Sequence, residues 1–558
     1  MFDHVEDRYH LSNSSFHAFL TEISNISMES IANPLYFFSN LSLNPPSCSN
    51  VVRFIDVLEF FFVAHPLSGR KEGEEHKRVM YFHPKGEQLE RQSEITGFAE
   101  AVVNFTENFL STSHRDISEK LTESDDGFDF RTVTTQRTEH VYIRTEDDQF
   151  MLGVSISKQL SHVSDYPLFQ PAIRSILSDA YKMFRMFFGT FSSFIKTVPD
   201  DIPKFKERLD FFFSKYIPLL KVHKMPLLDH LGGVEFLRMS GPLYLNVVSL
   251  ITELREEFPI IEKVMFLYQD KLLYYQLSKR DLPSLFRYLT HNLLPTTLAP
   301  ELEHSGRNAS KGRYLRGPTD LTTDVPLLGD ESLSVVHLHS EQEAEFQDEL
   351  VGYQMMVYRC LNATVCMFVR NSASFTNGDS DRRNSDVSQS SSIRSSPPQN
   401  GVVSRRLLRN VDQFLETELA QVASKIGDEV GDEKLTDATD FHYIYFNPSS
   451  LSMTSSLSTS PSLSVAASGS ASTSKVPLPP VDVNRLVCDT MSNFVSDTEE
   501  FGECFVKSSS DWWIVIKKVN SRLLVLILPP SSYTSSLADV QSKTATIVRS
   551  HFEAIFFS

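Results

Sequence analysis

One arrangement recurs three times along this chain of 558 residues: two short runs rich in Val, Phe, Leu and Tyr, then a longer run with helical periodicity. Short apolar runs bounded by polar turns are typical of strands. Apolar residues spaced three and four apart come together only on one face of a helix. Small antiparallel sheets bury one or both faces under such helices. The sequence therefore predicts an α+β fold of three modules, each a small antiparallel sheet flanked by helices.

The first copy starts with the strands VLEFFFVA (57–64) and RVMYF (78–82), joined by a polar turn. A helix over 94–110 follows, with Ser93 as its expected N-cap. HVYIRT and QFMLGVSIS then form a hairpin around Glu146-Asp147-Asp148, and Pro171 starts the next helix. The face of the 94–110 helix that should pack on the sheet consists of Ile95, Phe98, Ala99, Val102, Val103, Phe109 and Leu110.

The second and third copies repeat this order. KVMFLY and KLLYYQL are joined by the two-residue turn Gln269-Asp270, and a helix over 281–294 follows with Asp281 as its cap. In the third copy FHYIYF is followed, after an interruption, by the hairpin WWIVIKK–VNSR–LLVLIL and a helix near 537–552.

Two Ser-rich stretches interrupt the pattern, and neither can bury enough apolar surface to offset the entropy of ordering it. We therefore expect disordered insertions at 371–401 and 449–480. The expected organisation is a leader (1–50), a first module (51–200), a helical connector (201–232), a second module (233–440) and a third module (441–558).

The charge and the cysteines limit the class of protein. A net charge of −18 argues against a nucleic-acid partner, because phosphates would be repelled. No window approaches the ~20 apolar residues of a membrane span, and the acidic N-terminus lacks a secretory signal. Five scattered cysteines fit reduced thiols in a cytosolic protein. Cys360 and Cys366, six apart on one expected strand, should be core thiols on the same face.

No sequence motif for phosphate binding, metalloprotease activity or nucleophilic hydrolysis occurs, so we expect neither an enzyme nor a cofactor. His65, His76 and His83 are the local metal candidate. Since an antiparallel pair puts His65 and His83 at opposite ends of its ladder, the two His-Pro dipeptides are interpreted as strand ends. A hydrolase built around these histidines stays as a competing hypothesis.

Two helices offer candidate surfaces. On the 94–110 helix, Gly97, Ala101 and Phe105 form a second apolar line on the flank, which suits either a protein interface or intramolecular packing. The segment 204–224 could be a membrane-surface or acidic-partner helix, or an ordinary helix that packs its Phe stripe into the core. Its basic residues are Lys204, Lys206, Arg208, Lys215, Lys221 and Lys224.

Three stretches carry a resemblance to a known family: YFHPKGE…EITGFAEAVVNFTENF, LDHLGGVEF with EKVMFLYQDKLLYYQL, and DWWIVIKK…HFEAIFF. In this order the chain resembles the vacuolar fusion proteins of the calcium-caffeine-zinc sensitivity family, from about Arg53 to Ser558. The resemblance implies three longin-like modules and pairing with a second tri-longin subunit, the monensin-sensitivity protein. Together the two subunits would act as guanine-nucleotide exchange factor for the late-endosomal Rab GTPase.

The resemblance also implies where this chain meets its partners. In the family the first modules of both subunits pair and form the GTPase-binding surface together. The corresponding helix motif is Gly97, Glu100, Ala101, Val102, Phe105 and Thr106, after the strand end His83-Pro84. The expected partner or GTPase interface is Gly97, Glu100, Ala101, Phe105 and Asn108.

Several expectations follow for location and mechanism. The chain should lie in the cytoplasm, in peripheral contact with late-endosome and lysosome membranes, and contain no catalytic residue or metal of its own. The alternative is a related tri-longin scaffold of another trafficking or ciliary complex, without exchange activity.

Overall fold

A computed structural model gives the fold of the chain. It describes residues 54–110, 128, 130–146, 149–158, 170–195, 202–220, 232–297, 312–316, 321–322, 333–340, 350–371, 403–433, 440–457, 477, 479–496, 499–530 and 536–552. The expected leader (1–50) lies outside these residues, and so does the expected insertion 371–401 apart from Asn371.

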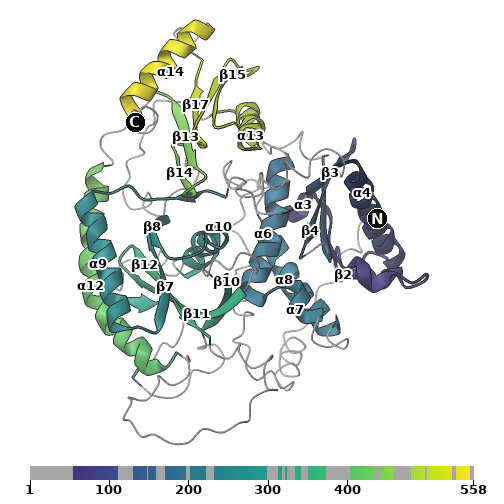
Figure 1. Cartoon of the computed structure of the whole chain (residues 1–558), viewed down its shortest axis with the longest axis horizontal. Coiled ribbons are helices and arrows are strands. Elements are labelled where there is room, and N and C mark those ends of the chain that lie inside the picture. The colour runs from purple at the N-terminus through teal and green to yellow at the C-terminus, as the bar shows by residue number, and fades with distance from the viewer. Residues whose placement is uncertain are drawn as a thin grey trace, which may run out of the picture.

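The described residues form three sheets that share one strand order (Figure 1). The first has the order β2-β1-β5-β4-β3 and consists of β1 (Leu58–Ala64), β2 (Val79–His83), β3 (Phe130–Thr134), β4 (Thr138–Thr145) and β5 (Phe150–Ser157). The second has the order β10-β11-β12-β7-β8, with β7 (Ile261–Tyr268), β8 (Lys271–Tyr275), β10 (Ser334–His339), β11 (Leu350–Cys360) and β12 (Ala363–Arg370); β9 (Arg313–Tyr314) also pairs with β11. The third runs β15-β16-β17-β13-β14-β6, with β6 (Val234–Glu235), β13 (His442–Asn447), β14 (Ser452–Ser455), β15 (Phe501–Lys507), β16 (Trp513–Val519) and β17 (Arg522–Leu528).

Apart from β9 and β6, the spatial order in each sheet is therefore second, first, fifth, fourth and third strand of the module. A helix follows the second strand of each module: α4 (Leu89–Leu110), α10 (Leu282–Arg287, continued by the π-helical turn Tyr288–Leu293) and α13 (Val481–Ser496). Another helix follows the fifth strand: α6 (Gln170–Phe188), α12 (Arg405–Glu433) and α14 (Leu537–His551). The other helices within the described residues are α3 (Phe54–Val57), α7 (Phe191–Ile195), α8 (Ile202–Leu219) and α9 (Gly241–Glu257), with 3-10 turns at Pro66–Gly69 and Glu75–Arg78. The predicted α+β fold of three modules is confirmed.

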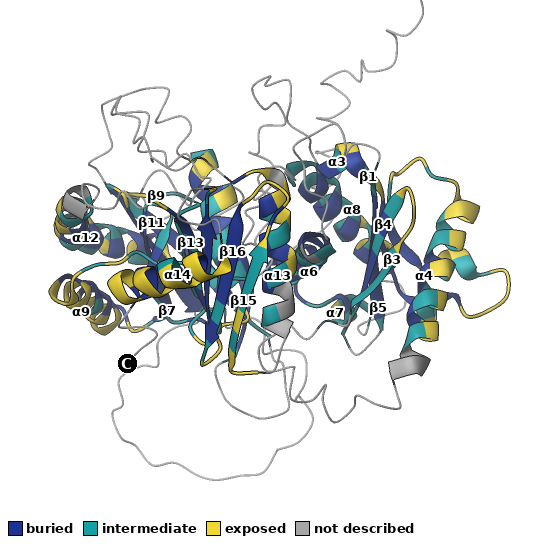
Figure 2. Cartoon of the chain, turned by 90° about the horizontal axis from the view of Figure 1, so that it is seen from above, coloured by how far each residue is buried: buried dark blue, intermediate teal, exposed yellow. Residues whose placement is uncertain are grey.

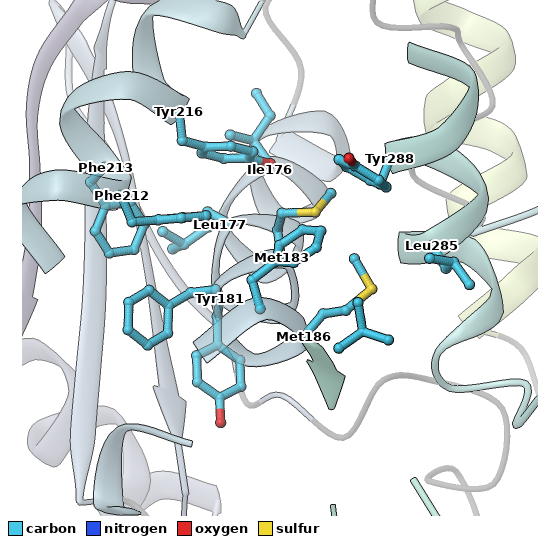
Figure 3. Close-up of a cluster of buried hydrophobic side chains, with 14 of the residues drawn as sticks. Ile176, Leu177, Tyr181, Met183, Met186, Phe212, Phe213, Tyr216, Leu285 and Tyr288 are labelled. Carbon is cyan, nitrogen blue, oxygen red and sulfur yellow. The ribbon is translucent and has the colours of Figure 1, made fainter. Parts of the chain in front are cut away.

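The first and second modules share one hydrophobic core. Helix α6 lies between the first sheet and α10, and its side chains reach in both directions (Figure 3). On one side Phe184 contacts Phe212 of α8, with ring centroids 5.4 Å apart. On the other side Phe187 contacts Tyr288, with ring centroids 5.0 Å apart. Because these rings belong to one continuous cluster, the two modules bury each other's faces.

Helix α8 lies in the range expected to be a connector, 201–232. Its apolar stripe is instead fully inside the first module, with Phe205, Leu209, Phe212 and Phe213 at 0% exposure. Phe213 contacts Phe61 of β1 and Tyr81 of β2 at 4.9 and 5.2 Å between ring centroids. The expected connector is therefore, over α8, a part of the first module; residues 221–231 lie outside the described residues.

The Ser-rich range 449–480 is not an insertion over its whole length. Its first part forms β14, whose Met453 is buried opposite Phe446 of β13. The expectation of disorder is thus wrong for 449–457. Met453 packs into the core of the third module, and the backbone of β14 pairs with β13, so this Ser-rich segment forms a strand despite its polar composition. Residues 458–476 and 478 lie outside the described part of the chain.

Three local expectations need correction. Helix α4 begins at Leu89, four residues before the expected cap Ser93. Asp281 precedes α10 but does not cap it: its carboxylate accepts hydrogen bonds from the backbone N–H of His339 (2.7 Å) and from His339 Nδ1 (2.6 Å). Cys360 and Cys366 are buried, free thiols as expected, yet they lie in different strands, β11 and β12, and in different core clusters.

Candidate protein-interaction site

Helix α4 covers the outer face of the first sheet, at the edge of the molecule (Figures 1 and 2). Its inner face packs Ala99 and Val103 onto Phe62, Phe82 and Tyr142 of the sheet. The central strand β5 contributes no side chain at Gly153, and the rings of Phe62 and Tyr142 occupy that space.

Three side chains from the sheet and the preceding turn hold α4 in place. Arg78 Nη1 donates to Glu100 Oε2 at 2.8 Å, while its Nη2 donates to the Gly69 carbonyl at 3.0 Å. Arg131 Nε donates to Thr106 Oγ1 at 2.8 Å, and Arg144 donates to the side-chain oxygen of Asn104. These contacts fix the rotation of the helix and hence the face that it turns outward.

The outer face of α4 is apolar at its centre. Phe98 is 52% exposed, Phe105 is 65% exposed, and Ala101 is exposed between them. These residues are spaced three and four apart, so they lie on one face of the helix. We call Phe98, Ala101 and Phe105 the α4 apolar face.

The structure divides the residues that were expected at this interface. Ala101 and Phe105 point outward as expected, and Gly97 is half-buried beside Arg78 Nη1. Glu100 is engaged by Arg78, so it helps to position the helix. Asn108 lies within α4, but its side chain is outside the described residues. Of the residues expected to face the sheet, Ala99 and Val103 do so, whereas Phe98 is 52% exposed and that part of the expectation is wrong. The side chains of Phe109 and Leu110 lie outside the described residues.

The equivalent helices of the other modules differ from α4. In α10, Leu282 and Leu285 belong to the core that the first two modules share. Among the side chains of α13 that the structure describes, the exposed ones are Asp482, Arg485 and Asp489, all charged. Among the described side chains of α4, α10 and α13, the exposed large apolar ones therefore belong to α4. Exposed aromatic residues grouped on one helix face are typical of a protein-interaction site.

On the second candidate surface the Phe stripe of α8 packs inside the first module, so these rings are not available for insertion into a lipid surface. Of its basic residues, Lys204 is exposed and Lys206 is half-buried. Arg208 lies over the ring of Phe194 at 4.7 Å and Lys215 over Phe211 at 4.0 Å. Burial lowers the pKa of Lys206 and of Lys215. Lys221 and Lys224 lie outside the described residues.

The histidines lie as the strand-end interpretation predicts. His83 is opposite Phe61, whereas the backbone N–H of His65 donates to the Arg78 carbonyl beyond the other end of the ladder. His65 Nδ1 hydrogen-bonds to Ser68 Oγ at 2.6 Å. Within the ranges that the structure describes, no three His, Cys, Asp or Glu side chains gather closely enough to hold a metal ion. Among the described helices, none combines the length and apolar character that crossing a bilayer requires.

Comparison with known proteins matches each module to a longin domain. Residues 58–189 match the first longin domain of INTU, CCZ1 and HPS4, residues 261–416 match the second Intu longin-like domain, and residues 437–547 match the third. Each range contains the five strands that the three sheets have in common, whereas β6, α8 and α9 lie outside the matched ranges.

Full-length relatives extend the similarity along the chain. A vacuolar fusion protein CCZ1 homolog of Nematostella vectensis is 27% identical, covering 89% of this chain and 97% of the relative. The homolog of Xenopus laevis is 25% identical over 90% of this chain and 98% of its own. That of Dictyostelium discoideum is 21% identical, with 89% and 98% covered.

Proposed function

We propose, because this chain belongs to the family of tri-longin vacuolar fusion proteins of the CCZ1 type, that it is one subunit of a heterodimeric guanine-nucleotide exchange factor. Its partner would be the tri-longin subunit of the monensin-sensitivity family, and its substrate the late-endosomal Rab GTPase. The relatives are named vacuolar fusion proteins, which supports a role in fusion and trafficking at the vacuole or lysosome.

The α4 apolar face is the observation that supports this proposal at the level of residues. Phe98, Ala101 and Phe105 form an aromatic-rich surface on an element that the sheet holds rigidly. A second longin module could cover this surface with its own helix, since the small Ala101 lets another backbone approach between two rings. The paired first modules would then offer one joint surface to the GTPase.

Such a protein needs no covalent chemistry. An exchange factor binds the nucleotide-free GTPase more tightly than the loaded form, and this difference in affinity drives nucleotide release. We accordingly propose that the chain is not an enzyme in the covalent sense. It would act at the surface of late endosomes and lysosomes, carried there by its partners, because the apolar stripe of α8 is already used inside the first module.

Release of labelled GDP from the late-endosomal Rab tests the proposal. The full chain with its partner should accelerate release over the partner alone. Ala101→Arg should abolish pairing, because it would bury an unpaired charge in the interface. Ala545→Arg is the matched control, since Ala545 is also an exposed helical alanine but lies on α14 of the third module.

Two results would contradict the proposal in different ways. Equal pairing of the Ala101→Arg and Ala545→Arg chains would remove α4 from the interface. Normal pairing without any acceleration of GDP release, together with capture of a different Rab or of ciliary partners, would favour the alternative tri-longin scaffold.

A further inference from the structure

A short segment before α9, residues 233–237, makes main-chain hydrogen bonds to two sheets. On one side its strand β6 runs parallel to β14, with Val234 opposite Ser452 and Glu235 opposite Met453. The backbone N–H of Val234 donates to the carbonyl of Leu451 at 2.8 Å. The segment precedes the strands of the second sheet in sequence, yet it completes the sheet of the third module.

On its other side the same segment contacts the second sheet. Phe236 forms a parallel bridge with Leu272 of β8, and the backbone N–H of Leu237 donates to the Leu272 carbonyl at 2.9 Å. Both β8 and β14 would otherwise be the last strands of their sheets. An edge strand leaves backbone groups unpaired, so one segment satisfies the edges of two sheets at once.

Side chains hold the segment between the two sheets. Val234 is fully buried in the core that the first two modules share. A Cβ on Gly233 would lie 3.0 Å from Met453 and 3.3 Å from Phe446, so the segment approaches the third module so closely that these two side chains would have to shift to admit one. Beyond the segment, the N–H and Oγ of Ser240 donate to Glu429 of α12 at 2.5 and 2.7 Å.

We propose that residues 233–237 are a strap that makes the second and third modules one mechanical and cooperative unit. The modules cannot separate without breaking the strap's bonds to β8 or to β14. Since the strap is only five residues long, loss of its bonds on one side frees the backbone that makes the bonds on the other. A substitution that breaks the hydrogen bonds at one sheet edge should therefore speed hydrogen exchange at both edges.

Hydrogen–deuterium exchange of the full chain tests this coupling through two reciprocal variants. Val234→Pro removes the N–H that bonds to β14, and Leu237→Pro removes the N–H that bonds to β8. We expect each variant to speed the exchange of residues 452–455 and of residues 271–275 by about tenfold or more, as expected when buried hydrogen bonds are lost. Exchange that rises only on the side of the removed N–H would overturn the proposal.

Arg238→Pro is the matched control. It places a proline directly after the segment, at an exposed residue. Among the described residues the Arg238 amide donates to neither β8 nor β14, so this variant should leave both exchange rates unchanged. Should Val234→Pro fail to fold, Leu237→Pro remains as the backbone test, because loss of its bond to β8 must also speed exchange at β14; faster exchange at residues 271–275 alone would refute the strap.

Discussion

Gly153→Ala tests how tightly α4 and the first sheet are packed. Gly153 lies on β5 between Phe62 of β1 and Tyr142 of β4. An added Cβ would be 2.3 Å from Phe62 Cε1 and 2.8 Å from Tyr142 Cδ1. Both rings are fully buried, and they form the surface on which α4 packs. The Phe62 ring would have to move by about 1 Å in an interior that is close-packed.

The expected net cost is about 2 kcal/mol. Overpacking of a core typically costs about 1–3 kcal/mol, and a clash with two buried rings places this substitution at the upper end of that range. The lower entropy of the unfolded chain returns about 0.4–1 kcal/mol when alanine replaces glycine. Hydrogen–deuterium exchange of the amides of β1, β4 and β5 in the full chain measures this local free energy of opening.

Gly86→Ala is the control for the same substitution. Gly86 is also in the first module, but an added Cβ there would meet no atom within 4 Å. This variant should stay within about 0.5 kcal/mol of the wild type. If the amides of β1, β4 and β5 exchanged no faster in Gly153→Ala than in Gly86→Ala, the rings of Phe62 and Tyr142 would be free to move aside. The tight packing below α4 would then be refuted.

Two further outcomes follow from polar groups. In a double-mutant cycle, Arg78→Met and Glu100→Gln should show a coupling of about 1 kcal/mol in unfolding free energy, since the pair is only partly exposed; additive effects would mean that the pair does not position α4. Burial lowers the pKa of His337 in the folded chain, as it does for His65 and His140. As pH drops below about 6.5 the unfolded chain binds protons before the folded chain does, so the free energy of unfolding should fall. His337→Met should make the melting temperature depend less steeply on pH. An unchanged dependence would contradict this role of His337.

The repeated module could be predicted from the sequence because it depends on local patterns. The turns Gln269-Asp270 and Asn520-Ser521 each lie between two runs rich in apolar residues, a pattern typical of paired strands. The structure has a hairpin at both places. Positive φ angles at Gln269, Asn520 and Ser521 are accommodated in these tight turns. Hydrophobic periodicity also predicts helix α4, but not the residue at which it begins, which is Leu89 and not the residue after Ser93.

The arrangement of the modules could not be predicted in the same way. Nothing in the sequence of α6 distinguishes a helix that covers one sheet from a helix shared by two modules, since both need apolar residues on a wide face. Likewise, β14 has a single large apolar residue, Met453, in a Ser-rich context, and its backbone partners come from β13 and from the distant Val234. Long-range pairing of this kind leaves little trace in local composition.

The candidate site lies between these two cases. Periodicity identified an apolar flank on α4, and Ala101 and Phe105 are exposed there. Phe98 was assigned to the wrong face because Phe and Ala at neighbouring positions both fit a broad apolar stripe. The bond between Arg78 and Glu100, 22 residues apart, sets the rotation of the helix, and this bond is visible only in the structure.

Phe98 gives the sharpest test of what the α4 apolar face does. Phe98→Asp should leave the free chain folded, since the ring is 52% exposed and its removal opens no buried cavity. Pairing with the tri-longin partner should weaken by about 30-fold or more, because an aromatic anchor at an interface contributes about 2 kcal/mol or more.

Leu245→Asp is the matched control for Phe98→Asp. Leu245 is 66% exposed on α9 of the second module, so both variants replace an exposed apolar residue of a helix by the same charged one. Isothermal titration with the partner and thermal unfolding of the free chain separate binding from stability. If the two variants paired equally well, the rings on α4 would belong to the scattered apolar surface that any soluble protein exposes. If only Phe98→Asp lost its partner, the same ring that was misassigned to the core would be the one that holds the two subunits together.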